Sequence, residues 1–232
     1  DPARGGTKNL FLGHPHHSIE TGMTWYYLVQ CAYNIEAMMS LIELSFSFTA
    51  QSPISAKTRS LQKPLKIEWS PTCRGDFPEM FAHHIITNIL VISSSNCRFT
   101  RIGSMVFLVH DVSDVPVDMS KLANFMKWKV ATTVCFMMLV LVWLAMRLVV
   151  FPLIIVKSVF SESRLLYQDG SMSPILFKMC MPLFQCILVA LTALHLFWFL
   201  MLIRIGYHLV IKGERHDLTE HKNGEERKKK EA

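Results

Sequence analysis

Five blocks of apolar sequence constrain this chain more than any other feature, because each is long enough to cross a lipid bilayer as a helix. They cover residues 24–48, 77–95, 102–123, 130–156 and 175–211. Only Arg147 interrupts the fourth block, and the fifth, longer than one crossing needs, is expected to begin at an interfacial turn near Pro182. Hydrophobic residues make up 51% of the 232 residues, too many for an ordinary soluble domain. The sequence therefore predicts an all-α, polytopic membrane helix bundle with about five spans, and it excludes a soluble DNA-binding or signalling module.

The distribution of lysine and arginine orients this bundle, since cytosolic loops of membrane proteins are enriched in both residues. The loops after the first and third blocks and the C-terminal tail are basic, and with five spans all three fall on one side. We therefore expect a lumenal segment over residues 1–23, a transmembrane domain over 24–211 with a cytosolic loop over 47–75, and a disordered, basic cytosolic tail over 212–232. The net charge of +6 follows from this topology, so no nucleic-acid partner is expected.

The two ends of the chain bear on its cellular context. Lys229 and Lys230 occupy the fourth and third positions from the carboxyl end. This matches the dilysine signal that returns membrane proteins to the endoplasmic reticulum, although a basic tail can also match it by chance. The chain starts at Asp1 without an initiator methionine or a signal-peptide pattern, so we expect an N-terminal part of the protein to precede it. The six cysteines show no CxxC spacing and indicate no disulfide framework.

Ionisable residues interrupt the second and third blocks. His83 and His84 stand side by side in the second block, and His110, Asp111 and Asp114 lie in the third. Such side chains are costly at bilayer depth and are retained there mainly for a partner or a function. Two adjacent spans that both carry them predict one shared polar site inside the bundle.

Helical geometry is expected to bring these residues together. Asp111, Asp114 and Asp118 follow i, i+3, i+7 spacing, and with His110 they form one stripe that should face the bundle interior. With a rise of 1.5 Å per residue, His83 lies roughly 10 Å and Asp114 roughly 12–14 Å from the cytosolic ends of their helices. The imidazoles and carboxylates are therefore expected at one depth, in a site open to the cytosol.

Three kinds of chemistry fit neighbouring imidazoles and carboxylates. A neutral imidazole can act as a general base or as a nucleophile, a carboxylate can orient the imidazole or hold a cationic amine, and both can bind a metal. A metal centre is disfavoured because the nearest other histidines, His14, His16 and His17, are predicted on the opposite side of the membrane. His195 and His208 are single residues, which more often join helices or lie at the interface than bind a ligand. The structural alternative for the whole set is a polar patch that joins two helices.

The sequence around the histidines resembles the Lag motif of ceramide synthases, which belong to the TLC-domain membrane family. The resemblance is carried by residues 76–84, by Arg101-Ile102-Gly103 and by His110-Asp111-Val112-Ser113-Asp114. Residues 14–16 and 25–30 are similar to the start of an earlier span in that family, and the resemblance extends from about residue 11 to residue 212. It implies N-acylation of a sphingoid base such as sphinganine or sphingosine by a fatty acyl-CoA, which makes (dihydro)ceramide in the endoplasmic reticulum membrane.

The resemblance also implies roles for particular residues. The predicted catalytic residues are His83, His84, His110, Asp111 and Asp114. The predicted substrate-binding residues are Trp198, which falls where the family has a similar residue, and two residues suggested by helix geometry, Thr87 on the face of His83 and Asp118 in the carboxylate stripe. We expect His83 or His84 to attack the thioester or to deprotonate the amine, and Asp111 and Asp114 to orient an imidazole and attract the amine. No metal and no cofactor other than acyl-CoA, as co-substrate, are expected.

The expected partners are fatty acyl-CoA, a sphingoid base and the lipid bilayer, with a homo- or hetero-dimer allowed for. The competing hypothesis is a non-enzymatic TLC-domain protein in lipid sensing, transport or translocation.

Overall fold

A computed structural model describes residues 6–11, 13–14, 19–49, 66–70, 74–164, 166 and 173–208. The predicted tail over residues 212–232, with Lys229 and Lys230, lies outside the described residues, as does the middle of the predicted cytosolic loop.

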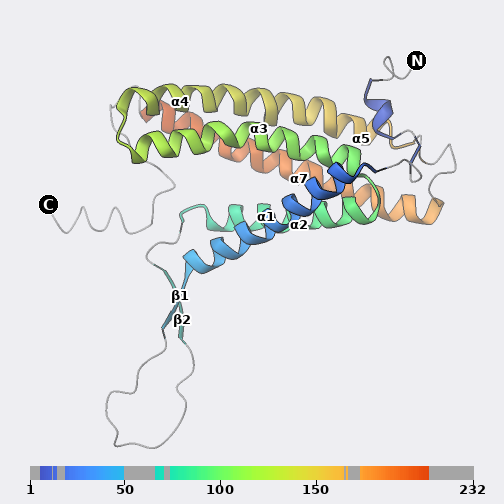
Figure 1. The fold of residues 1–232 in the computed structure, drawn as a ribbon, viewed down its shortest axis with the longest axis horizontal. Coiled ribbons are helices and arrows are strands. Elements are labelled where there is room, and N and C mark those ends of the chain that lie inside the picture. Colours follow the sequence, from blue (N-terminus) through green and yellow to red (C-terminus); the bar gives the residue numbers. More distant parts are fainter. Residues whose placement is uncertain are drawn as a thin grey trace, which may run out of the picture.

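The described chain is an antiparallel bundle of long helices. Its elements are the short 3₁₀ helix η2 (Gly6–Leu10), then α1 (Thr21–Ser45), β1 (Phe46–Thr49), β2 (Lys66–Trp69), α2 (Phe77–Asn96), α3 (Thr100–Phe125), α4 (Lys129–Trp143), the π-helical stretch η3 (Leu144–Val156), α5 (Lys157–Ser161) and α7 (Pro174–Tyr207). α4, η3 and α5 follow one another without a break and form one long helix (Figure 1). Each of the five predicted blocks thus forms a helix, which confirms the predicted all-α bundle.

Two predicted boundaries are wrong. α7 runs unbroken through Pro182, so no interfacial turn lies there; proline is tolerated inside membrane helices, where neighbouring groups satisfy the freed backbone. The first helix ends at Ser45 rather than at residue 48, because Phe46–Thr49 forms a strand that pairs antiparallel with Lys66–Trp69. The loop predicted over residues 47–75 therefore begins as a β-hairpin.

The predicted cap of α2 is also absent. The sequence suggests that Asp76 and Glu79 form a capping box, but the Asp76 side chain makes no cap hydrogen bond. Its carboxylate instead accepts hydrogen bonds from Arg74 Nε (2.9 Å) and Nη2 (3.0 Å). Pro78 lies in the first turn as predicted, where its missing N–H is harmless. A charge-assisted bidentate pair has displaced the neutral backbone contact.

The helix ends predicted to be cytosolic all gather at one end of the bundle. Figure 1 shows the hairpin, the start of α2, the turn from α3 to α4 and the end of α7 toward the left, and the opposite helix ends toward the right. Both helix turns use a residue with a left-handed backbone, Arg98 (φ 59°) between α2 and α3 and Lys127 (φ 58°) between α3 and α4. These tight turns hold the three helices antiparallel.

Apolar side chains cover both the inside and the outside of the bundle. The interior is closed by fully buried residues on η3 and α7, such as Phe151 and Leu191, each 0% exposed. On the outer faces, large apolar side chains such as Leu141, Leu153 and Leu200 are exposed. Among the described helices, Lys129–Ser161 and Phe177–Tyr207 are long and apolar enough to cross a membrane. An apolar outer surface of this kind is suited to lipid rather than to water.

Gly103 lets α1 approach α3 closely. A Cβ atom at this position would lie 1.7 Å from the hydroxyl oxygen of Tyr27 and 3.2 Å from Ser94 Oγ. The Tyr27 ring is buried, and its hydroxyl donates to the carbonyl of Thr100 over 3.1 Å. Glycine is therefore needed here for space.

We predict that Gly103→Ala destabilises the fold by about 1–3 kcal/mol, the usual cost of overpacking a filled core. Tyr27→Phe in the same chain removes the clashing oxygen but leaves a ring carbon 2.9 Å from the added Cβ atom, so it should recover part of the loss. The melting temperature of the detergent-solubilised protein checks both variants, with Tyr27→Phe alone as the control. An unchanged melting temperature in Gly103→Ala would contradict this packing.

Candidate active site

A cavity of about 560 Å³ opens between the helices and is lined by residues of α1, α2, α3, α4, η3 and α7. Its volume lies in the range of about 300–1,000 Å³ that is typical of small-molecule sites. All eight residues predicted to be catalytic or substrate-binding line it: His83, His84, Thr87, His110, Asp111, Asp114, Asp118 and Trp198. The eight residues therefore line one chamber, as their helical spacing and depth predict. The hydrogen-bond partners of the histidines and aspartates differ from those expected.

His83 has no carboxylate partner. Its ring lies against the rings of Trp198 (5.3 Å between centroids), His84 (5.5 Å) and His110 (6.4 Å). Within the described chain its ring forms no hydrogen bond, and its buried Nδ1 is without a partner. The expectation that an aspartate orients this imidazole is therefore wrong, but the ring keeps a lone pair available for chemistry.

His110 is hydrogen-bonded through both ring nitrogens. Its Nδ1 contacts the carbonyl oxygen of Val106 over 2.7 Å, and its Nε2 contacts Nε2 of His195 over 3.0 Å. A backbone carbonyl and a second imidazole, not a carboxylate, therefore orient this ring. His195 is completely buried and lies behind His110, outside the cavity wall.

Asp114 is neutralised by Arg147. The guanidinium donates through Nη2 to Asp114 Oδ1, through Nε to Ser113 Oγ and again through Nη2 to the carbonyl of His110. It also stacks over the Trp143 ring, with its central carbon 4.1 Å from the ring centroid. The single charge of the fourth apolar block is thus the partner of a carboxylate on α3.

Asp111 forms no ion pair among the described residues. Its Oδ2 accepts hydrogen bonds from the Tyr26 hydroxyl and from Gln30 Nε2, each over 2.8 Å. Its Oδ1 accepts no hydrogen bond within the described part of the chain. Asp111 also lines the cavity. Asp111 is therefore the better placed of the two carboxylates to bind a cationic group.

The three residues predicted to bind substrate lie at the edges or in the wall of the cavity. Asp118 is largely exposed and lies 3.5 Å from Lys121 Nζ, toward the end of α3 that turns into α4. The Thr87 hydroxyl donates to the backbone carbonyls of His83 and His84, so its hydrogen is already used. Trp198 forms part of the apolar wall with its ring edge-on to His83. Of these three, Trp198 is the residue whose ring packs against an imidazole ring.

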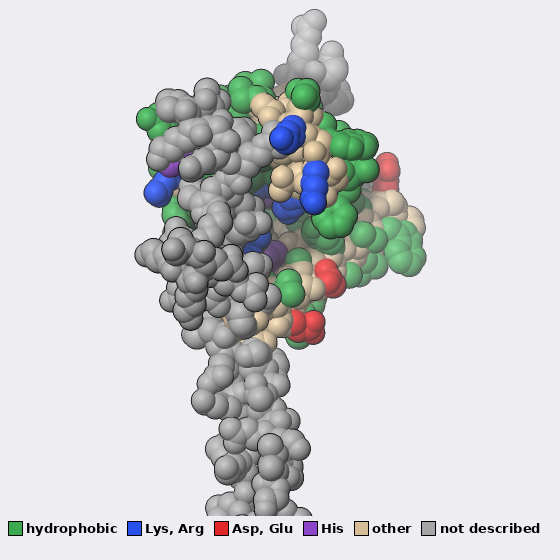
Figure 2. Space-filling model, turned by 90° about the vertical axis from the view of Figure 1, so that its left-hand side faces the viewer, with side chains coloured by type: hydrophobic (Ala, Val, Ile, Leu, Met, Phe, Trp, Pro, Cys, Tyr) green, Lys and Arg blue, Asp and Glu red, His purple; other side chains and the backbone are tan. Residues whose placement is uncertain are grey.

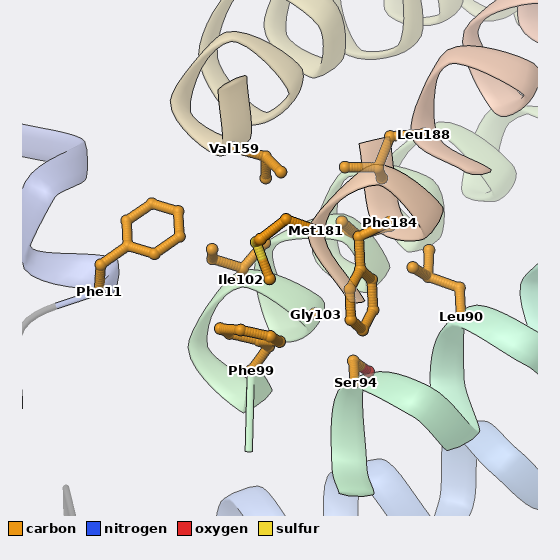
Figure 3. A pocket seen from close by; sticks show the side chains of 11 residues that line it. Phe11, Leu90, Ser94, Phe99, Ile102, Gly103, Val159, Met181, Phe184 and Leu188 are labelled. Atoms are coloured by element: carbon orange, nitrogen blue, oxygen red, sulfur yellow. The ribbon is translucent and has the colours of Figure 1, made fainter. Parts of the chain in front are cut away.

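The cavity has a polar end and an apolar end. Figure 2 faces the end at which α3 turns into α4, where Lys and Arg side chains gather on one part of the surface and Asp and Glu on another. At its other end Leu90 and Val106 separate it from a small apolar cavity of about 30 Å³. Figure 3 shows side chains of α2, α3, α5 and α7 closing around this second space, with Phe11 beside them. The site thus changes from charged to wholly apolar along the bundle.

Sequence reasoning missed four residues that hold the site together. His195, Arg147, Tyr26 and Gln30 each bind one of the predicted residues. Arg147 could have been found as the lone charge in an apolar block, because such a charge needs a partner. His195 is a single histidine in the last apolar block, with no other ionisable residue at helical spacing, so the sequence did not indicate that it belongs to the site.

Comparison with known proteins identifies the family. The TLC domain family model matches residues 1–204. The chain belongs to the TLC-domain family. This confirms the resemblance seen in the Lag-like motif, and together with the two apolar helices it identifies a multi-pass membrane protein.

Several relatives of this TLC-domain chain carry the name ceramide synthase. The chain is 29% identical over 212 residues to ceramide synthase hyl-2 of Caenorhabditis elegans. This alignment covers 89% of this chain and 55% of that protein. It is 30% identical over 201 residues to ceramide synthase 4 of Bos taurus, covering 87% and 42% respectively. With ceramide synthase 1 LOH3 of Arabidopsis thaliana it shares 33% over 134 residues, covering 58% and 43%. The chain therefore spans about half the length of the curated relatives it matches.

Proposed function

We propose that this TLC-domain protein is a ceramide synthase, an acyltransferase that moves a fatty acyl group from acyl-CoA to the amine of a sphingoid base. The observation that carries the proposal is the cavity itself. Among the described residues, it holds an imidazole with no hydrogen-bonded partner, His83, and a carboxylate with one oxygen that accepts no hydrogen bond, Asp111, above an apolar floor. The names of the relatives over most of this chain support the same activity.

The thioester of acyl-CoA is already activated, so the protein needs only a nucleophile or base, an amine site and a dry chamber. In one route, a ring nitrogen of His83 attacks the thioester carbonyl, the C–S bond breaks and CoA leaves as the thiolate. The amine then attacks the acyl-imidazole, the amide C–N bond forms as the bond between the acyl carbon and the ring nitrogen breaks, and the freed His83 imidazole takes up the amine proton. In the other, His83 takes the amine proton while the amine attacks the thioester directly, and the C–S bond breaks to release CoA as the thiolate.

The same proposal covers the setting of the enzyme. Placement in the endoplasmic reticulum membrane is what the resemblance to ceramide synthases implies. The basic loops support an orientation with the C-terminus and the charged mouth of the cavity in the cytosol. Cytosolic acyl-CoA would then enter at the charged end and direct its tail into the apolar end. A homo- or hetero-dimer stays a prediction.

The proposal is tested by the conversion of acyl-CoA and sphinganine to dihydroceramide in membranes that contain the full-length protein, across acyl-chain lengths. In rapid-mixing experiments, a burst of free CoA before the product indicates the acyl-imidazole route, and its absence indicates direct transfer. Binding of either lipid without turnover at any chain length would reject the enzyme and support the sensing or transport hypothesis.

Asp111→Asn is predicted to raise the KM for the sphingoid base about ten-fold or more while the KM for acyl-CoA stays within about two-fold. Asparagine keeps the hydrogen bonds to Tyr26 and Gln30 but removes the charge that attracts the ammonium, and a charge-assisted hydrogen bond contributes about 1.5–3 kcal/mol. Steady-state kinetics with each substrate varied in turn measures the effect. Asp118→Asn, which alters an exposed carboxylate at the same cavity, is the matched control. Equal rises in both KM values would contradict the role given to Asp111.

A further inference from the structure

His195 and His110 form a buried imidazole pair for which the proposed reaction has no explicit use. The two Nε2 atoms are 3.0 Å apart, and the ring centroids are 4.8 Å apart. The Phe151 ring, completely buried, lies edge-on to both imidazoles. The Trp143 indole N–H donates to the backbone carbonyl of His195 over 3.1 Å. The pair is thus held in place from its apolar side, and its inner member, His195, is shielded from solvent.

The positions of the protons follow from the partners. A carbonyl oxygen only accepts hydrogen bonds, so His110 Nδ1, which contacts the Val106 carbonyl, must carry a hydrogen. In a neutral His110, Nε2 is then a bare lone pair, and the hydrogen between the rings belongs to His195 Nε2. His195 Nδ1 is therefore also a bare acceptor, in keeping with its lack of a partner among the described residues. A further proton on the pair would add a positive charge beside Arg147, which donates to the His110 carbonyl.

We propose that His195 is a positioning residue that donates its Nε2 hydrogen to His110, so that His110 stays fixed in one orientation with no free lone pair. Of the two rings stacked across the cavity, His83 and His110, only His83 then has a nitrogen free to react. This inference rests on the proposed acyl transfer, and it deepens that proposal by excluding His110 as the reacting imidazole.

Loss of the donor would release a competing group. Without His195 the His110 ring loses one of its two anchors and can turn, so that its Nε2 lone pair accepts a hydrogen bond from water in the cavity, at a ring 6.4 Å from that of His83. The effect should fall on turnover more than on binding, because the groups that bind the substrates are unchanged.

The test compares His195→Leu with His195→Gln in membranes that contain the full-length protein. Leucine removes the donor, and we expect kcat to fall about ten- to hundred-fold with both KM values within about three-fold. Glutamine retains an N–H that can reach His110 Nε2, and it should restore kcat to within about three-fold of the wild type. His208→Leu, the same change just beyond α7 and away from the cavity, should leave kcat unchanged. Wild-type kcat in folded His195→Leu, or equal losses in the leucine and glutamine variants, would overturn the proposal.

A second measurement separates this inference from the proposed activity. If the wild type itself transfers no acyl group, the proposed function fails, and the imidazole pair is then judged on thermal melts alone. In a double-mutant cycle of His110→Leu and His195→Leu, we expect the drops in melting temperature to be strongly non-additive, as for residues in direct contact. Additive drops would show that the two rings are not coupled and would overturn the pairing whatever the activity.

Discussion

Asp114→Leu should destabilise the protein by about 3 kcal/mol, the lower end of the cost of breaking a buried ion pair. The Arg147 side chain is only 5% exposed, whereas that of Asp114 is 50% exposed toward the cavity. Removal of the carboxylate leaves a buried guanidinium with only Ser113 Oγ, the His110 carbonyl and the Trp143 ring as partners. Arg147→Met should cost less, about 1 kcal/mol, because the carboxylate left behind can be hydrated from the cavity.

The double variant Asp114→Leu/Arg147→Met is the control for the unequal costs predicted for the two single variants. Replacing both partners of a buried ion pair by apolar residues is often close to neutral, so it should melt nearer to the wild type than Asp114→Leu alone. For a chain of this length about 3 kcal/mol corresponds to a drop in melting temperature of about 6–12 °C. Thermal melts in one detergent at one pH compare the three variants. A larger loss in Arg147→Met than in Asp114→Leu would contradict the assignment of Arg147 as the buried partner.

The helices of this bundle were predictable because each apolar block exceeds the length of a bilayer crossing. Their ends were less so. The hairpin that begins at Phe46 is a pairing between distant segments, which no local pattern announces. Pro182 looked like a break, but α7 continues through it, since a surrounding bundle can compensate for one missing backbone hydrogen bond.

In the candidate site, the positions of the residues were predictable from the sequence, but their hydrogen-bond partners were not. Helical period and rise fix which residues share a face and a depth, so the sequence placed His83, His110 and Asp114 in one chamber. It did not give the pairing, because several donors lie within reach of a carboxylate at that depth. Asp114 binds Arg147 from the fourth helix, and His110 binds His195 from the last. Such choices depend on how the helices are rotated and packed against each other.

His83→Ala should lower kcat for acyl transfer about a thousand-fold, within the range of about 10²–10⁴ that a positioned proton-transfer group contributes. The structure favours His83 over His84 as the reacting residue. His83 lies against Trp198 and His110 in the interior of the cavity, whereas the ring contact of His84 among the described residues is with His83 alone. The neighbouring His84→Ala is the matched control, because it removes the same ring one residue away, and its loss should be at least ten-fold smaller.

Initial rates with saturating acyl-CoA and sphinganine, together with a melting curve for each variant, separate loss of chemistry from loss of fold. The alanine at position 83 leaves a gap of the size of an imidazole beside an open chamber, so added imidazole should restore part of the turnover in His83→Ala and none in the wild type. Retained activity in folded His83→Ala, or a larger loss in His84→Ala, would reassign the chemistry to His84. Its ring lies edge-on to that of His83 and lines the same cavity, so the acyl carbon would then react one residue away within that chamber.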